Sequence, residues 1–431
     1  MNRYKKFLCT LLTIFLAANL SACSLDAFPA GDSLSERIEK YFLIEIMGSN
    51  PVYVEYQYNP SVFVAFFKEE DADGVYIPIS EINVYETQYP DCSGTWYRDQ
   101  LSGEELTIYN AYLYAMEHCY KGFSLFVEDN EKDFWYIRDM VALDSPFLEQ
   151  NYDEEGEFTR SWDPSEDGQR IYFHADQFGQ EYWSQKLTAL DQCKKIIAEM
   201  PAELESQEEK MLYLYHYVCD QITYTEYDRS LHPNYLYDGV CLGKTNCDGY
   251  SNMLSLLFNL LGTDACEITG YDEEPTEDAQ EDNDGHTWVA AKLGEHYYHF
   301  DATYEDTTED VHTDRMIYFG ISDTMASCDI IDYDTLTPVC SDSSRDLSFV
   351  DLTMANITDH EQINTLAELT DQQAKKYEFE TYVLVNCTVS DEELDAMLDR
   401  YVEMVYEIES VSVYYIEIHG RTLMRVATKP W

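Results

Sequence analysis

The sequence predicts an α+β chain, because helix-start signals and strand-like runs alternate along it. Strand-like runs rich in β-branched and aromatic residues occur at 51–67, 286–304 and 411–427. Helix starts are marked by the capping box, in which a serine side chain bonds a backbone amide and a glutamate three residues later bonds back. Four such pairs occur: Ser33 with Glu36, Ser102 with Glu105, Ser206 with Glu209, and Ser390 with Glu393.

Length and charge limit what the chain can do. Its 431 residues allow two to four domains, and a hydrophobic content of 45% is enough to fill their cores. There are 83 acidic and only 27 basic residues, which gives a formal net charge of −56. A surface with this charge repels phosphate backbones, so we expect no nucleic-acid partner.

The first residues predict export. Arg3, Lys5 and Lys6 precede an apolar stretch at 7–20, which is shorter than the roughly 20 residues that a membrane span needs. The stretch ends in Leu20-Ser21-Ala22-Cys23, which resembles a bacterial lipobox. We therefore expect a lipoprotein signal peptide at 1–22, lipid on Cys23 and a tether at 23–32. The protein would then be anchored to the cell membrane on its extracytoplasmic face.

The rest of the chain divides into several regions. An N-terminal α+β region is expected at 33–175. A helical stretch follows at about 181–222, broken near Pro201, and its second half has one apolar face made of Met211, Leu214, Tyr215, Val218 and Ile222. A Ser/Asp-rich linker at 341–346 precedes a small C-terminal α+β module at 347–431, predicted to contain a strand, a helix and two strands.

Residues 239–304 contain the predicted chemistry. Cys247 is expected on the first turn of a helix that ends at Gly262. There the helix dipole and unpaired backbone N–H groups stabilise a thiolate and offer a donor to an oxyanion. The carboxylate of Asp248, next along the chain, should act against this effect.

Two strand-like runs after this helix predict a hairpin with Gly294-Glu295 as its turn. Paired positions then sum to 589, so that His286 is opposite Thr303 and Asp301 lies two residues along on the same face. Such diagonal neighbours are within side-chain reach. Asp301 can therefore hold the His286 imidazole in the tautomer that accepts a proton from Cys247.

The order of these motifs resembles the transglutaminase-like superfamily of papain-type cysteine enzymes. The matching motifs are Cys247 at a helix start, GHTW at 285–288 and HFDATY at 299–304. The resemblance implies a domain at 176–340 with a papain-like core, in which the helix bearing the nucleophile packs on an antiparallel sheet. It also implies a catalytic triad of Cys247, His286 and Asp301, with Tyr224 and Tyr227 as candidates for a second oxyanion donor.

The resemblance further implies acyl transfer through a thioester on Cys247. We expect an exported, lipid-anchored enzyme that acts on peptide or glutamine-type amides, first as a protease or amidase. The alternatives are a transglutaminase that joins amines to glutamine, or an inactive surface binding or scaffold protein with the same fold.

The expected partner is a protein or peptide substrate. An acidic segment at 272–284 has three interpretations, one of which concerns the charge of this substrate. The segment is either a solvated loop, a rim that selects cationic substrates, or a calcium loop. The EF-hand alignment fails, with Gln280 at position 1 and Ala291 at position 12. No C-x-x-C pair occurs, so we predict neither a metal site nor a cofactor.

Overall fold

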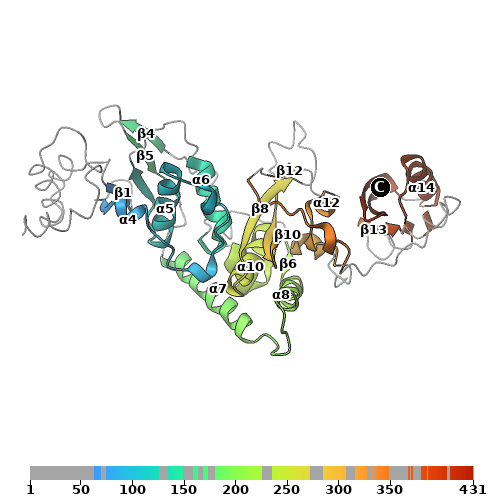
Figure 1. Cartoon of the computed structure of the whole chain (residues 1–431), viewed down its shortest axis with the longest axis horizontal. Helices are drawn as coiled ribbons and strands as arrows, with labels where there is room; N and C mark the ends of the chain where they lie inside the picture. Colours follow the sequence, from blue (N-terminus) through green and yellow to red (C-terminus); the bar gives the residue numbers. More distant parts are fainter. Residues whose placement is uncertain are drawn as a thin grey trace, which may run out of the picture. The chain divides into compact units, whose positions relative to one another are not determined.

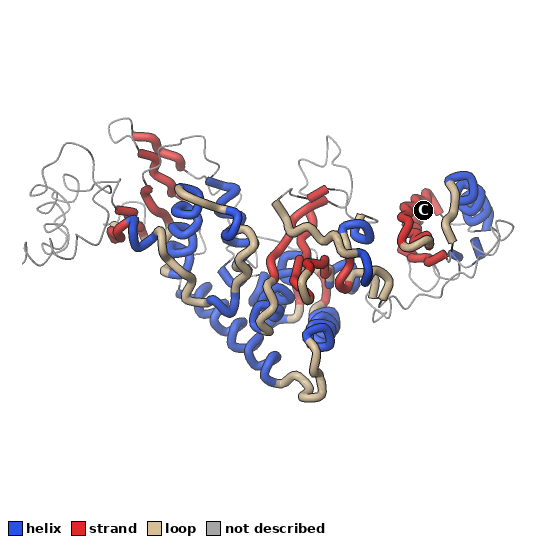
Figure 2. Tube along the Cα trace, in the orientation of Figure 1, coloured by secondary structure: helices blue, strands red, loops and turns tan. Residues whose placement is uncertain are grey.

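The computed structural model describes sixteen stretches of the chain, shown in Figures 1 and 2. They are 63–68, 74–125, 134–148, 159–163, 168–172, 180–225, 235–271, 285–306, 316–327, 332–333, 336–348, 367–368, 370–371, 380–385, 387–404 and 408–430. The predicted signal peptide, Cys23, the Ser33 capping box, Tyr227 and the acidic segment 272–284 lie outside these residues.

The predicted α+β class is confirmed, since helices accompany antiparallel sheets. The chain forms two compact units. The first comprises 1–88, 101–141 and 151–179, and the second comprises 89–100, 142–150 and 180–431. Among the helices of the described residues, none combines the length and the apolar character that a membrane crossing requires.

The first unit contains a five-stranded antiparallel sheet in the order β2-β1-β3-β5-β4. Its strands are β1 (Phe63–Phe67), β2 (Val75–Pro78), β3 (Gly122–Leu125), β4 (Thr159–Asp163) and β5 (Gly168–Tyr172). Its helices are α4 (Ile79–Ile82), α5 (Glu104–Glu117) and the start of α6 (Phe134–Asp144). Phe66 and Phe123 are fully buried in its core, where the ring of Tyr112 meets Phe123 edge-on.

The capping box predicted at Ser102 is wrong. Helix α5 takes Gly103 as its N-cap and has no side-chain capping bond. Gly103 has a φ of +59°, which glycine adopts readily because it lacks a Cβ atom. The helix therefore starts one residue later than the serine signal indicates, and Ser102 lies outside the cap position.

The second unit is built on a five-stranded antiparallel sheet in the order β11-β10-β9-β8-β12. The strands are β8 (Ala265–Tyr271), β9 (Gly285–Leu293), β10 (His296–Phe300), β11 (Phe319–Ile321) and β12 (Asp332–Tyr333). Helix α10 (Cys247–Leu260) packs against β9 and β8 (Figure 1). It is buried on nearly all sides from Gly249 to Asn259, so it is the central helix of this unit.

Two further helices pack on α10, namely α7 (Gln180–Ala198) and α8 (Gln207–Gln221). The predicted break between them is confirmed, and Ser206 and Glu209 form the complete capping box at the start of α8. The apolar face predicted for α8 and the residue after it is buried as a whole: Met211, Leu214, Tyr215, Val218 and Ile222.

Short elements complete this part of the second unit. They are η2 (Pro90–Cys92), η3 (Arg98–Gln100), η4 (Pro146–Leu148), β6 (Thr223–Tyr224), α9 (Tyr235–Tyr237), η5 (Asp238–Leu242), β7 (Lys244–Thr245), α11 (Ala302–Glu305), α12 (Asp323–Ala326) and η6 (Ser343–Arg345). Strands β6 and β7 pair in parallel. The predicted linker region contains η6, and Asp346 after it is buried and accepts hydrogen bonds from the backbone and hydroxyl of Ser322.

The C-terminal elements follow the predicted order of strand, helix and two strands. They are β13 (Glu380–Val385), α14 (Asp391–Met404), β14 (Ile408–Ile418) and β15 (Arg421–Pro430), and the sheet order is β13-β15-β14. Val383, Met397, Tyr401 and Met424 are buried together in a core of their own. The Glu393 carboxylate accepts from the Ser390 backbone, as a capping box requires of its second residue.

Candidate active site

Cys247 is the first residue of α10, as predicted. The residue before it, Asn246, is extended and makes no side-chain capping bond to the helix. Its side-chain amide instead donates to the Asp248 carboxylate at 3.0 Å. Because no cap from Asn246 engages the first-turn backbone N–H groups, they can serve an oxyanion that forms beside the partly buried thiol.

The hairpin register predicted from the sequence is confirmed as far as Phe300, where β10 ends. Each pair between β9 and β10 sums to 589, from His296 opposite Leu293 to Phe300 opposite Val289. Gly294 takes a φ of +67° at the turn, where a glycine is favoured. The predicted pairing of His286 with Thr303 is wrong, because the chain turns into α11 at Ala302 and His286 pairs with Gly270 of β8 instead. Asp301 is the N-cap of α11, just after β10, and from there its side chain reaches His286 near the start of β9.

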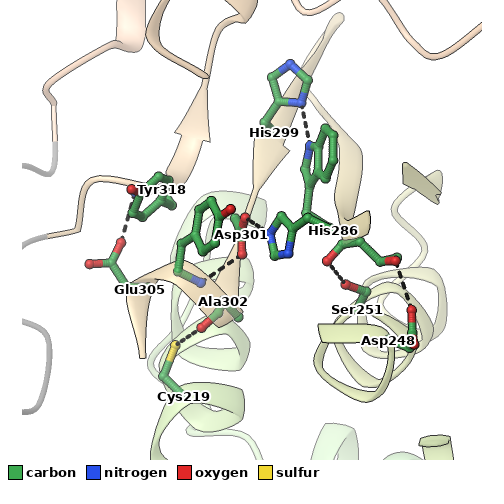
Figure 3. Close-up of polar contacts among 12 residues, drawn as sticks. Cys219, Asp248, Ser251, His286, His299, Asp301, Ala302, Glu305 and Tyr318 are labelled. Atoms are coloured by element: carbon green, nitrogen blue, oxygen red, sulfur yellow. Dashed lines mark hydrogen bonds and ion pairs between the residues drawn. The ribbon is translucent and has the colours of Figure 1, made fainter. Parts of the chain in front are cut away.

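The imidazole of His286 lies between the other two predicted residues. Its Nε2 donates to Oδ2 of Asp301 at 2.6 Å (Figure 3), and the Cys247 side chain is near enough to the ring to raise its pKa. Since Nε2 is engaged by Asp301, Nδ1 is the nitrogen left for the thiol. His286 and Asp301 are only 6% and 2% exposed, so water competes little for this contact.

Two opposing effects decide the charge of His286. Burial alone disfavours an imidazolium and lowers the pKa. The negative charge of Asp301, its hydrogen bond to Nε2 and the contact with Cys247 outweigh burial and raise the pKa of His286 to about 10. The imidazole is therefore charged at neutral pH, in the form that can protonate a leaving amine.

Asp301 is held by contacts on several sides. Its Oδ1 accepts from the backbone N–H of Tyr304 at 3.0 Å, and its own N–H donates to the carbonyl of Tyr318 at 3.1 Å. Its carbonyl accepts from the Tyr215 hydroxyl at 2.7 Å. With Oδ1 fixed in this way, Oδ2 is left pointing at His286.

Aromatic rings flank the imidazole. The Tyr304 ring stacks on His286 with centroids 4.1 Å apart and planes at 6°, and the Trp288 ring lies at 5.7 Å and 15°. An aromatic face attracts a cation, so both rings favour the imidazolium form. They also restrict rotation of the His286 side chain.

The structure brings together His299, Asp323 and Cys340, whose donor atoms lie within 4.8 Å of one another. His299 Nδ1 accepts from the Trp288 indole N–H at 3.0 Å (Figure 3), and Nε2 contacts Asp323 at 2.9 Å. Because the indole can only donate, Nδ1 must be the acceptor and Nε2 must carry the proton. Both ring nitrogens are then engaged, so this group fits a polar network better than a metal site.

Of the two candidate oxyanion donors, Tyr224 lies within the described residues and Tyr227 lies outside them. Tyr224 lies on β6 in register with Thr245, two residues before the nucleophile, and is 44% exposed. Its ring is 6.4 Å from that of Tyr250 on α10. This places Tyr224 near the start of α10, and its role as an oxyanion donor stays a prediction.

Comparison with known families covers this same part of the chain. Residues 194–302 match the model of the transglutaminase-like superfamily, and this range contains Cys247, His286 and Asp301. The chain carries a transglutaminase-like domain. A crystal structure of a TGase is similar at 18% identity and a TM-score of 0.24, over 34% of this chain and 44% of that chain. This chain therefore spans under half the length of that protein. A separate comparison with curated proteins gave no match.

Several contacts of the transglutaminase-like domain were not predicted from the sequence. They include the Tyr304 stack, the Trp288–His299–Asp323 network and a hydrogen bond from the Thr287 hydroxyl to the Asp248 carboxylate at 2.9 Å. The aromatic residue three positions after Asp301 was a visible signal for the first. The others depend on how α10, β9 and α12 pack, for which the sequence offers no local signature.

Proposed function

We propose that the protein is an exported, lipid-anchored cysteine enzyme that cleaves peptide or glutamine-type amides through a thioester on Cys247. The observation that carries the proposal is the position of His286 between the Cys247 thiol and the Asp301 carboxylate, with a pKa raised to about 10. A charged imidazole beside a thiol at a helix start favours the thiolate form, which is the nucleophile.

In the first half of the reaction, the Cys247 thiolate attacks the amide carbonyl carbon. The oxygen becomes negatively charged and is stabilised by backbone N–H groups at the start of α10. His286 gives its Nδ1 proton to the nitrogen as the C–N bond breaks, and the amine leaves. The acyl group then remains on sulfur as a thioester, and His286 is neutral.

In the second half, neutral His286 takes a proton from the attacking molecule, which adds to the thioester carbon. The C–S bond breaks and the Cys247 thiolate is restored. With water the product is an acid, so the enzyme is a protease or amidase. With a primary amine the product is a new amide, which is the transglutaminase reaction.

To test this proposal, glutamine-containing peptides are incubated with the protein in the presence and absence of a labelled primary amine. We expect cleavage or deamidation that needs Cys247 and is lost in Cys247→Ala, with little label incorporated. Label incorporation without hydrolysis would replace the proposal with the transferase alternative. Tight peptide binding with no turnover would instead favour the scaffold alternative.

Export and anchoring have a test of their own. The apolar stretch at 7–20 and the cysteine at position 23 support them. We expect the protein produced in a bacterium to incorporate labelled fatty acid and to partition with detergent, and Cys23→Ser to do neither. Equal partitioning of both proteins into the aqueous phase would contradict the lipid anchor.

A further inference from the structure

The residues that follow the nucleophile and the base contact each other. Asp248 comes directly after Cys247, and Thr287 comes directly after His286. The Thr287 hydroxyl donates to Oδ1 of Asp248 at 2.9 Å (Figure 3). The other carboxylate oxygen, Oδ2, accepts from the Asn246 side chain at 3.0 Å. Both oxygens of Asp248 are therefore engaged within the site.

A second bond joins the same two elements one turn further along the helix. The Ser251 hydroxyl on α10 donates to the backbone carbonyl of Thr287 at 2.7 Å. Asp248 and Ser251 are three residues apart and so lie on one face of the helix. Thr287 is 7% exposed and Ser251 is 3% exposed, so the bond between them is buried, whereas the bond from Thr287 to Asp248 is partly buried.

This arrangement ties the position of the thiol to that of the imidazole. A slide of α10 along β9 that separated Cys247 from His286 would also lengthen the bond between their neighbours. A hydrogen bond to a carboxylate is stronger than one between neutral groups, and Asn246 holds the carboxylate from its other side. Moving a catalytic group by about 1 Å can slow the reaction on the order of 100-fold.

We propose that Asp248 and Thr287 are positioning residues, and that the hydrogen bond between them fixes the nucleophile's helix to the base's strand. The inference rests on the proposed function, because it assigns these residues a role in activating Cys247. Neither residue needs to touch the substrate. A bond that served only the fold would change the unfolding temperature and leave the reactivity of the thiol as it was.

The test measures alkylation of Cys247 by iodoacetamide across pH, with peptide mass spectrometry to separate Cys247 from the other thiols. Thr287→Val keeps the shape of the side chain and removes the hydroxyl, whereas Thr287→Ser keeps the hydroxyl. Thr107→Val is the matched control, because Thr107 is buried, its hydroxyl donates to Asn83 at 2.7 Å, and both residues belong to the first unit, whereas the predicted triad belongs to the second. Thermal unfolding of each variant is followed in parallel.

We expect the unmodified protein to react quickly at about pH 6, where an ordinary thiol of pKa about 8.5 is almost unreactive. Thr287→Val should slow this reaction about 10-fold, and Thr287→Ser should stay within about two-fold of the unmodified protein. Thr107→Val should lower the unfolding temperature and leave the alkylation rate unchanged.

The outcomes separate the two proposals. Fast alkylation of the unmodified protein and of Thr287→Val alike would overturn the positioning role and leave the proposed function standing. Slow alkylation of the unmodified protein, equal to that of His286→Ala, would overturn the proposed function and the positioning role with it.

Discussion

His286 is charged although it is buried, and Asp301 is the reason. Burial of a histidine can lower its pKa by several units, so an isolated imidazole at this position would be neutral at pH 7. The Asp301 carboxylate, whose Oδ2 lies 2.6 Å from Nε2, raises the pKa above neutrality instead, because water screens the attraction within this buried pair poorly. The fixed geometry of Asp301 therefore controls the protonation state of the proposed acid.

This balance gives a prediction for Asp301→Asn. The imidazole should titrate near pH 10 in the unmodified protein and below pH 7 in the variant, because the variant keeps the burial and loses the charge. Nuclear magnetic resonance of the protein labelled at histidine carbons measures this, with His286→Gln identifying the signal. Titration of the unmodified protein near 6.5 would contradict the prediction.

The raised pKa of His286 also makes the stability of the protein depend on pH. The pKa of His286 is raised above its unfolded value of 6.5, so folding favours the protonated form. The stabilisation is fully present below pH 6.5 and is lost as the pH rises toward about 10. The unmodified protein should therefore lose more of its unfolding free energy over this range than His286→Gln does.

At the scale of elements, the placement of Cys247 depends on how closely the start of α10 approaches β7. Gly249 lies two residues after the nucleophile, on the first turn of the helix. A Cβ atom built on it would lie 2.1 Å from Oγ1 and 2.6 Å from Cβ of Thr245, a side chain that is fully buried. Only glycine allows this approach without a shift of the helix.

We therefore expect Gly249→Ala to destabilise the protein by about 1–3 kcal/mol and to slow alkylation of Cys247, since overpacking a buried contact forces the backbone to move. Gly285→Ala is the matched control. Gly285 precedes His286 in the chain, but a Cβ atom built on it would have its nearest neighbour at 3.9 Å, an ordinary van der Waals distance. Urea unfolding and alkylation of Cys247 are measured for both variants. Equal unfolding free energies and equal alkylation rates in the two variants would contradict the prediction.

Elements also differ in how well the sequence predicts them. The β9–β10 register follows from a two-residue turn and the two-residue period of strands, so local rules were sufficient. The Ser102 signature failed because Gly103 caps α5 instead, and local signals for helix ends are uncertain by a residue. The bond between Asp248 and Thr287 joins residues 39 apart in the chain, and it depends on how α10 is rotated on the sheet.

At the scale of the whole molecule, charge is the dominant feature. A net charge of −56 over 431 residues produces a negative potential that extends about 10 Å from the surface at 0.1 M salt. Such a field attracts cationic substrates and repels acidic ones before they reach the site. We therefore propose that the preferred peptide substrates are rich in lysine or arginine.

The prediction is that hydrolysis of a lysine-rich peptide slows as salt is added. Raising the salt from about 0.02 M to about 0.5 M should lower kcat/KM about 10-fold through KM, because screening removes the attraction and leaves the chemical steps unchanged. A peptide of the same length with glutamine in place of each lysine outside the cleaved bond is the control, and its kcat/KM should change less than about two-fold. Equal salt dependence of the two peptides would mean that the acidic surface serves solubility and has no part in choosing the substrate.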